Sequence, residues 1–219
     1  SRILGALRQG APAQALPHPE LTTYLAGPFG RGAQGQRVNP VDLLDIFENA
    51  ARGWRADVLH ADVVGWPLAV RAALDARSCQ TVVTGAVSPL QPGLAEALQG
   101  LQVRVFNQAL EAWKLEMFDT VDASVTSAQA GIADTGTVVL IPGMHEPRAL
   151  SLVPPVHVAV LMASRLHASL PAAMRALSPE SDMPTNLLLV TGPSKTADIE
   201  MNVVTGVHGP NIVGAFILQ

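Results

Sequence analysis

The chain has 219 residues, of which 48% are hydrophobic and 15% are charged. This composition suffices for a packed core and excludes a disordered or highly charged tail. The formal net charge of -4 and a pI near 5.8 exclude the basic surface with which proteins bind nucleic acid. Length leaves open whether there is one large domain or two small ones.

The single cysteine, Cys79, restricts the metal chemistry of the chain. One thiol can form neither an internal disulfide nor a cysteine-ligated iron–sulfur cluster or zinc site, so we expect no bound metal. No apolar stretch approaches the roughly 18 residues of a membrane span. Residues 1–8 lack the apolar segment of a signal peptide, and we therefore expect a cytoplasmic protein.

Residues 1–40 differ in character from the rest. Apolar side chains at the start fall on one helical face, which predicts a short amphipathic helix ending near Gly10. Residues 11–40 are rich in proline and glycine and predict an irregular arm. Residues 30–35 spell G-x-G-x-x-G, but no strand precedes them and no helix follows directly, which disfavours dinucleotide binding.

Helices and strands alternate after this arm. Asn39 suits a helix cap and Pro40 a first helical position, so a helix is predicted over 41–54. Further helices are predicted at 68–74, 94–98, 109–118 and 170–177. Strands are predicted at 58–64, 81–84, 103–106, 123–126, 138–141, 156–162, 187–190 and 215–218. This alternation predicts an α/β fold with a mostly parallel sheet covered on both faces, in one domain over 41–219.

Three polar loops follow predicted strands, at 85–93, 142–148 and 192–196. If the sheet is parallel throughout, all three loops open on the same edge. That edge is the usual ligand crevice of an open α/β sheet.

The segment richest in reactive groups is 190–210, which begins Val-Thr-Gly-Pro-Ser-Lys-Thr-Ala-Asp-Ile-Glu. Gly192 and Pro193 lack the long glycine loop of a P-loop. Ser194 is suited to cap a short helix, and Lys195 beside a helix start would bind carboxylate or phosphate together with Thr196. The alternative is a capped turn with a solvated lysine.

Asp198 and Glu200 are candidates for acid–base chemistry, although they share a face only in extended backbone. A carboxylate such as Glu200 between apolar neighbours needs a partner or a raised pKa. His208 precedes Gly209 in Gly-Val-His-Gly-Pro, where it can act as a general base, a ligand-binding donor or a residue that fixes a turn.

A second polar segment precedes the strand predicted at 138–141. Asp134, Thr135, Gly136 and Thr137 form an Asp-Thr-Gly-Thr turn. A tight turn in which the aspartate satisfies its own backbone explains this pattern. A carboxylate presented to a cleft explains it equally well.

The strings Gly-Pro-Ser-Lys-Thr-Ala-Asp-Ile-Glu and Gly-Val-His-Gly-Pro closely resemble motifs of the LUD-domain family, of the lactate utilisation protein C type. The resemblance extends over 128–140, where the family usually has an Ala-Glu-Thr-Gly-Thr-like turn, and to the first helix. It implies a three-layer α/β/α fold of the NagB/RpiA/CoA transferase-like kind. It also implies a part in the oxidation of L-lactate to pyruvate alongside separate iron–sulfur subunits.

One position departs from the family pattern, since Asp134 stands where glutamate is usual. A shorter side chain would retract the carboxylate by about 1.5 Å, which weakens any analogy to the glutamate nucleophile of CoA transferases. We therefore expect a cluster-free accessory protein with a cleft for a small carboxylate or phosphate. The alternatives are a stand-alone enzyme of the sugar-phosphate isomerase or acyl-CoA transferase type and a non-catalytic scaffold. The predicted ligand-binding residues are Gly192, Ser194, Lys195, Thr196, Asp198, Thr135, Gly136, Thr137 and Gly209, and the catalytic candidates are Asp134, Glu200 and His208.

Overall fold

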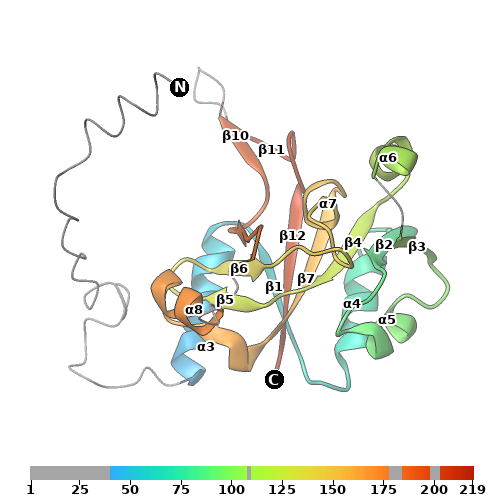
Figure 1. The fold of residues 1–219 in the computed structure, drawn as a ribbon. Helices are drawn as coiled ribbons and strands as arrows, with labels where there is room; N and C mark the ends of the chain where they lie inside the picture. Colours follow the sequence, from blue (N-terminus) through green and yellow to red (C-terminus); the bar gives the residue numbers. More distant parts are fainter. Residues whose placement is uncertain (1–39, 108–109, 178–183, 198–202) are drawn as a thin grey trace, which may run out of the picture.

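The computed structural model describes residues 40–107, 110–177, 184–197 and 203–219, which are drawn in colour in Figure 1. The helix and arm predicted for residues 1–40 lie outside the described residues, apart from Pro40. Asp198 and Glu200 lie outside them as well.

A parallel six-stranded sheet forms the centre of the fold. Its strands follow the order β1-β12-β7-β4-β2-β3, and every neighbouring pair is parallel. The strands are β1 (Asp57–Ala61), β2 (Thr81–Gly85), β3 (Gln102–Phe106), β4 (Ala123–Ser127), β7 (Val156–Met162) and β12 (Ile212–Leu218). The predicted α/β fold with a mostly parallel sheet is thereby confirmed.

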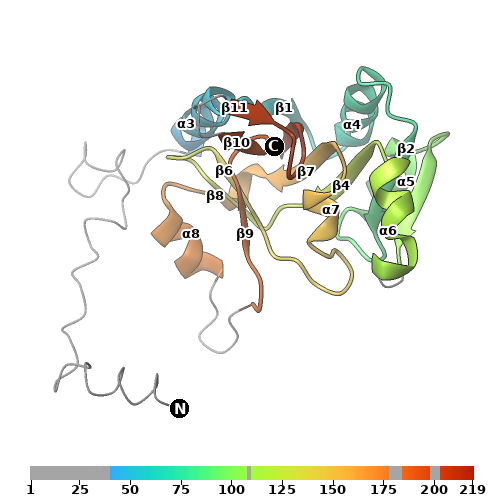
Figure 2. The same ribbon diagram turned by 90° about the horizontal axis from the view of Figure 1, so that it is seen from above.

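Helices cover this sheet on both faces. On one face, α4 (Trp66–Asp75) and α5 (Gln91–Ala97) pack against the large side chains of β12 and β7, with Phe216 fully buried. On the other face lie α3 (Pro40–Gly53), α6 (Leu110–Asp119) and α7 (Ala149–Leu152). Figure 2 shows α3 and α4 on either side of β1.

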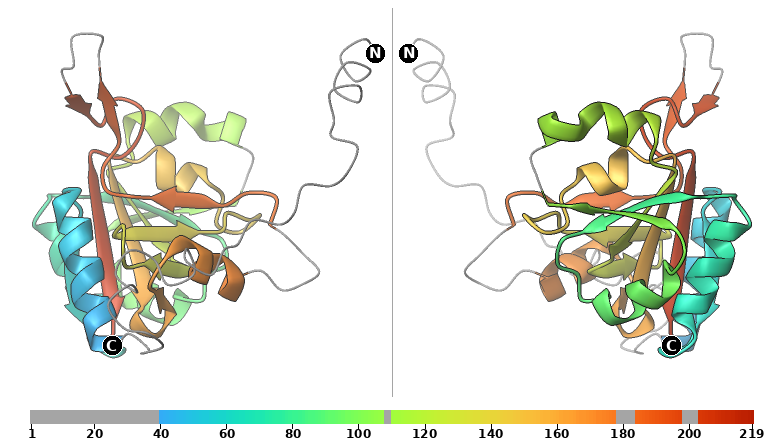
Figure 3. Two further views of the ribbon diagram at one scale, coloured as in Figure 1. Left: turned by 90° about the vertical axis from the view of Figure 1, so that its left-hand side faces the viewer. Right: turned by 90° about the vertical axis from the view of Figure 1, so that its right-hand side faces the viewer.

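A smaller four-stranded sheet packs beside α3 on the second face. It has the order β8-β5-β6-β9, formed by β8 (Leu166–His167), β5 (Ala130–Ile132), β6 (Thr137–Leu140) and β9 (Leu188–Val190). Its inner face joins the core of the large sheet through residues such as Val138 and Leu140. Its outer face packs through Val139 under α8 (Leu170–Leu177). Figure 3 shows this second layer edge-on, with α8 outside it.

The second sheet overturns one expectation about the polar loops. The register pairs Leu140 at the end of β6 with Leu188 at the start of β9, so the two strands are antiparallel and their carboxyl ends lie at opposite edges. Loop 142–148 folds back to the large sheet, where the Ala86 N–H donates to the His145 carbonyl over 2.9 Å. Loop 192–196 leaves the opposite edge. The prediction that the three loops share one edge is therefore wrong.

Ser194 does not cap a helix. It leads into the two-stranded hairpin of β10 (Lys195–Ala197) and β11 (Val203–Thr205). The Ser194 N–H donates to the Pro210 carbonyl over 2.8 Å, and the Gly206 N–H donates to the Ser194 carbonyl over 2.9 Å. These bonds hold the residue in extended backbone, so the predicted helix start at this position is wrong.

The strand predicted at 58–64 ends earlier, at Ala61, because a side chain forms a turn. The Asp62 carboxylate accepts the N–H groups of Val64 and Gly65 over 2.8 Å and 2.6 Å, which turns the chain into α4. Within the described ranges, no helix is long and apolar enough to cross a membrane.

Candidate ligand pocket

A pocket of about 560 Å³ lies on the outer face of the second sheet, beside the start of α8. We call it the Trp54–Lys195 pocket. Side chains from α8, from the second sheet and from the segments that follow α3 and β9 line it, namely Trp54, Ile132, Thr135, Thr137, Leu170, Leu189, Thr191, Pro193 and Lys195.

One wall of the pocket is apolar. Ile132 on β5 and Leu189 on β9 project from the outer face of the second sheet. α8 covers only part of this face, so Leu189 is left 45% exposed and Leu170 is left 39% exposed. Trp54 closes the wall and is itself half-exposed. Such apolar surface, open at a concave site, is available to a ligand.

The other wall is a chain of three threonine hydroxyls. The Thr137 hydroxyl lies 2.7 Å from that of Thr135 and 2.7 Å from that of Thr191. Strand pairing explains the contact between Thr137 and Thr191. Val138 pairs with Val190 in antiparallel register, so Thr137, one residue before Val138, lies opposite Thr191, one residue after Val190. Three hydroxyls carry three protons, and the two bonds between them use two. The third proton is directed to Asp134, whose carboxyl group accepts a side-chain hydrogen bond from Thr135, so the hydroxyls offer a bound molecule their oxygen lone pairs.

Lys195 supplies a positive charge at the rim. Its Nζ donates to the Trp54 carbonyl over 2.9 Å and lies 4.9 Å from the centre of the Trp54 ring. An ammonium has three donors, so two remain after this hydrogen bond. Among the described residues that line the pocket, Lys195 is the only one that carries a charge.

Two glycines bring the walls together. Gly136 has a φ of 62°, and a Cβ there would lie 2.1 Å from the Ala51 nitrogen in α3. Gly192 has a φ of 74°, and a Cβ there would lie 2.4 Å from the Trp54 carbonyl. Both positions require glycine because of the backbone angle and the close approach. Neither glycine is among the lining residues, so the structure places both behind the pocket wall.

Asp134 lies next to the pocket without lining it. Its Oδ1 is buried and has no hydrogen-bond partner among the described residues. Burial raises the pKa of Asp134, and hydrogen bonds from Thr135 partly oppose the shift. The carboxyl group is therefore easier to protonate than an exposed aspartate.

The structure brings only part of the predicted site together. Thr135, Thr137 and Lys195 line one pocket. Gly209 lies outside the lining, where a Cβ would lie 3.1 Å from the Ser194 Cβ. His208 is exposed and does not line the pocket either, and Thr196 follows on β10.

Sequence reasoning missed the remaining lining residues: Trp54, Ile132, Leu170, Leu189, Thr191 and Pro193. A pattern for two of them was present, since Leu189 and Thr191 fall on one face of a strand by simple alternation. No local pattern indicates Trp54, because it meets Lys195 across 141 positions of sequence.

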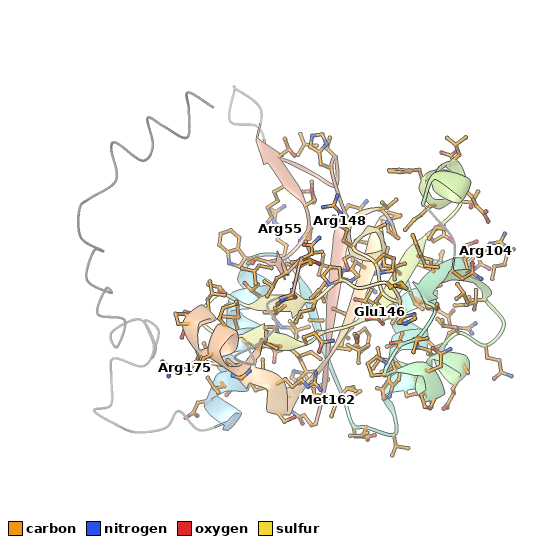
Figure 4. The ribbon with its side chains drawn as sticks, viewed as in Figure 1. Arg55, Arg104, Glu146, Arg148, Met162 and Arg175 are labelled. Carbon is orange, nitrogen blue, oxygen red and sulfur yellow. The ribbon has the colours of Figure 1, made fainter. Side chains whose placement is uncertain are left out.

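A second cavity lies at the carboxyl ends of β1, β12 and β7. This groove of about 400 Å³, the Val64–Leu90 groove, is lined by Val63, Val64, Trp66, Pro67, Pro89, Leu90, Pro92, Gly93, Glu96, Met162 and Leu218. Met162 is labelled in Figure 4. The groove occupies the place where open α/β sheets bind ligands, but Glu96 is the only charged group among its described lining residues.

The carboxyl end of β4 is closed by loop 142–148. The Ser127 hydroxyl donates to a carboxylate oxygen of Glu146 over 2.5 Å, and its N–H donates to the same oxygen over 3.3 Å. Through these hydrogen bonds Glu146, labelled in Figure 4, holds the loop over the carboxyl end of β4. In the part of the chain that the structure describes, no group of three or more His, Cys, Asp or Glu side chains could hold a metal ion.

Fold and pocket together define an α/β domain with a cavity of the size that small molecules occupy. The family model of the LUD domain matches residues 83–218, which include every lining residue of the Trp54–Lys195 pocket except Trp54. The chain belongs to the LUD-domain family.

Two relatives and one solved structure illustrate this membership. An uncharacterised protein of Neisseria meningitidis serogroup B is 32% identical over 173 residues, covering 78% of this chain and 74% of the relative. Lactate utilization protein C of Halalkalibacterium halodurans is 31% identical over 173 residues, covering 77% and 75%. The crystal structure of a DUF162 family protein from Deinococcus radiodurans is similar with a TM-score of 0.64 at 22% identity, covering 84% of this chain and 100% of that one. This last likeness concerns the fold alone.

Proposed function

We propose that the protein is a component of lactate utilisation, and that the Trp54–Lys195 pocket binds an anionic ligand in that process. The similarity to lactate utilization protein C of several bacteria supports the first part. The second part rests on Lys195, which lines the pocket beside the threonine hydroxyls and, among the described residues, commits one of its three N–H donors, to the Trp54 carbonyl.

The chemistry of the pocket suits a carboxylate or a phosphate. Hydrogen bonds between a charged donor and a charged acceptor are about twice as strong as neutral ones, and the lysine provides the charged donor. The threonine hydroxyls make the neighbouring wall polar. Desolvation by Trp54 and Ile132 strengthens the interaction with the lysine, since charges attract more strongly away from water.

Oxidation of L-lactate to pyruvate releases two electrons and two protons, which an acceptor must take up. The single cysteine of this sequence cannot ligate a cysteine-bound cluster by itself. We therefore assign the electron transfer to separate iron–sulfur subunits and give this chain an accessory role with no cluster of its own.

Growth on L-lactate tests the proposal. A strain without this gene should fail to grow on L-lactate as the carbon source and should grow normally on pyruvate, the oxidised product. The wild-type gene and the surface variant Leu68→Gln should restore growth, because Leu68 is 66% exposed on α4, outside the pocket. Lys195→Met should not restore it. Normal growth of the deletion strain on L-lactate would refute the proposal.

A stand-alone enzyme of the isomerase or acyl-CoA transferase type is less well supported. Such an enzyme needs its acid and base in one cleft. Among the described catalytic candidates, Asp134 lies beside the pocket, whereas His208 is exposed outside its lining.

A further inference from the structure

The Trp54–Lys195 pocket is much larger than a three-carbon acid. Its volume of about 560 Å³ lies within the roughly 300–1,000 Å³ that is typical of pockets for drug-sized ligands. A hydroxy acid of six non-hydrogen atoms would leave most of that space to water. Accepting that the pocket binds an anion, as proposed above, we propose that its ligand is an amphipathic monoanion. Such a ligand has one carboxylate group attached to a planar or otherwise apolar body.

The apolar wall indicates where that body would lie. Leu189 and Thr191 project from the same face of one strand, two residues apart, and are therefore separated by roughly 7 Å along the strand. An anionic group held by Lys195 beside Thr191 would thus place a body of two fused rings over Leu189, between Leu170 and Ile132. These three side chains offer the ligand body no hydrogen bond. A body that is apolar therefore binds more tightly, because it buries apolar surface against them.

The polar wall indicates the charge of the ligand. Lys195 is the only charged side chain among the described lining residues, and it lies at the Trp54 end of the pocket. One ammonium neutralises one negative charge. A dianion would retain an uncompensated charge next to apolar side chains, which is costly.

The size of the pocket, its open apolar wall and its single cation are three separate observations on described residues, and all agree with this ligand class. In the Val64–Leu90 groove, by contrast, the only charge among the described lining residues is the carboxylate of Glu96, which repels an anion. An anion that binds through its apolar rings alone could bind in this groove as well as in the pocket, whereas an anion that needs a cation would bind only in the pocket.

Calorimetric titration of the full chain with three probes tests the inference. The probes are 2-naphthoate, its neutral analogue 2-naphthalenemethanol, and L-lactate. We expect 2-naphthoate to bind at least about tenfold more tightly than L-lactate, because burying about 60 Å² of ring surface contributes that factor. We also expect it to bind at least about tenfold more tightly than the neutral analogue, because Lys195 pairs with its carboxylate.

Two pocket variants and one control variant test whether the probes bind in the Trp54–Lys195 pocket. Lys195→Met should weaken 2-naphthoate binding about tenfold and leave 2-naphthalenemethanol unchanged. Leu189→Gln should weaken both naphthalene probes and leave L-lactate unchanged, and Leu68→Gln on α4 should change nothing. Each substituted side chain is substantially exposed (Leu189 45%, Leu68 66%), so the variants should fold.

The outcomes separate this inference from the proposed function. If L-lactate or pyruvate binds as tightly as 2-naphthoate, and Lys195→Met weakens it, the amphipathic ligand is refuted while the anion pocket stands. If Lys195→Met leaves the affinity for every anion unchanged, the anion pocket itself is refuted. If 2-naphthoate binds equally well to both pocket variants, it binds elsewhere and the inference is overturned.

Discussion

The central strands of the large sheet and the edge strand β9 of the small sheet differ in burial. Every residue of β2 and β4 in the large sheet is buried, because helices or the second layer cover both faces. None of the three residues of β9 in the small sheet is fully buried. The inner strands β5 and β6 of the small sheet are also fully buried, so only its edge strand β9 keeps part of one face open beside α8.

This difference indicates that a cavity at the carboxyl edge of a parallel sheet is not a ligand site by its location alone. The carboxyl edge of the large sheet holds the Val64–Leu90 groove, in the conventional place but without a cation among its described lining residues. The open face of the small sheet holds the hydroxyls and the ammonium. We therefore expect substitutions in the large sheet to change stability, and substitutions on the open face of the small sheet to change binding.

The largest effect is expected in the core of the large sheet. Phe216 is fully buried, so Phe216→Ala should lower the free energy of unfolding by about 3–5 kcal/mol. Leu189→Ala on the open face should lower it by about 1 kcal/mol or less, because the side chain is 45% exposed. Urea denaturation of both variants measures the contrast. Equal losses would show that the small sheet is as tightly packed as the large one.

The turn between β5 and β6 is the exception in the small sheet. Gly136→Ala forces a side chain into positive φ and within 2.1 Å of the Ala51 nitrogen, and should cost about 2–5 kcal/mol. The matched variant Gly143→Ala meets no atom within 4 Å and should change stability by about 0.5 kcal/mol or less. Thermal unfolding compares the two. An unaltered Gly136→Ala protein would contradict the close packing of the pocket against α3.

Acid should destabilise the large sheet through His157. Complete burial lowers the pKa of His157 from 6.5 to about 4, and its Nε2 lies 2.9 Å from the Thr126 hydroxyl. The folded protein therefore binds this proton less readily than the unfolded chain does. The stabilisation is complete above pH 6.5 and is lost as the pH falls toward 4, by about 3 kcal/mol in total.

Denaturation at pH 7 and pH 4 measures this loss. His157→Gln cannot titrate, so its stability should fall by about 3 kcal/mol less than that of the wild type over the same interval. The pKa of His167 is also lowered by burial, and its contribution of the same sign remains in the variant. The raised pKa of Asp134 acts in the opposite direction and is likewise retained. An identical pH dependence of variant and wild type would rule out His157 as the source.

The smallest effect concerns the hydroxyl chain of the pocket. Thr137 is buried in its centre, so Thr137→Val should cost about 1–2 kcal/mol by breaking two hydrogen bonds. Thr135 is exposed at the end of the chain, and Thr135→Val should cost less than about 0.5 kcal/mol. Chemical denaturation distinguishes them. Equal costs would mean that the chain of hydroxyls contributes nothing to stability.

The sequence predicted the large sheet because each of its strands contains a short apolar or alternating segment, the longest of them in β7 and β12. The run over 156–162 became β7 with the same bounds. The small sheet escaped prediction because β5 has three residues and β8 has two, too few to show a period. Strands were predicted at 138–141 and 187–190, but nothing local reveals that they pair with each other in antiparallel register.

The pocket residues, like the strands, comprise some that the sequence predicted and others that it did not. The turn around Thr135 and the polar loop at Lys195 were recognisable from their chemistry. Trp54 was not, since it follows an ordinary amphipathic helix and reaches Lys195 through the packing of Gly136 on α3 and of Gly192 on Trp54. Local pattern therefore predicted the polar groups of the pocket except Thr191, and tertiary packing supplied Thr191 and the apolar wall.

A crystal structure with 6-bromo-2-naphthoate tests the central claim most directly, because anomalous scattering locates the bromine without ambiguity. The account predicts the carboxylate at Lys195 Nζ, beside Thr191, with the bromine beyond Leu189 on the open face of the small sheet. Bromine in the Val64–Leu90 groove, with the Trp54–Lys195 pocket holding only solvent, would contradict it.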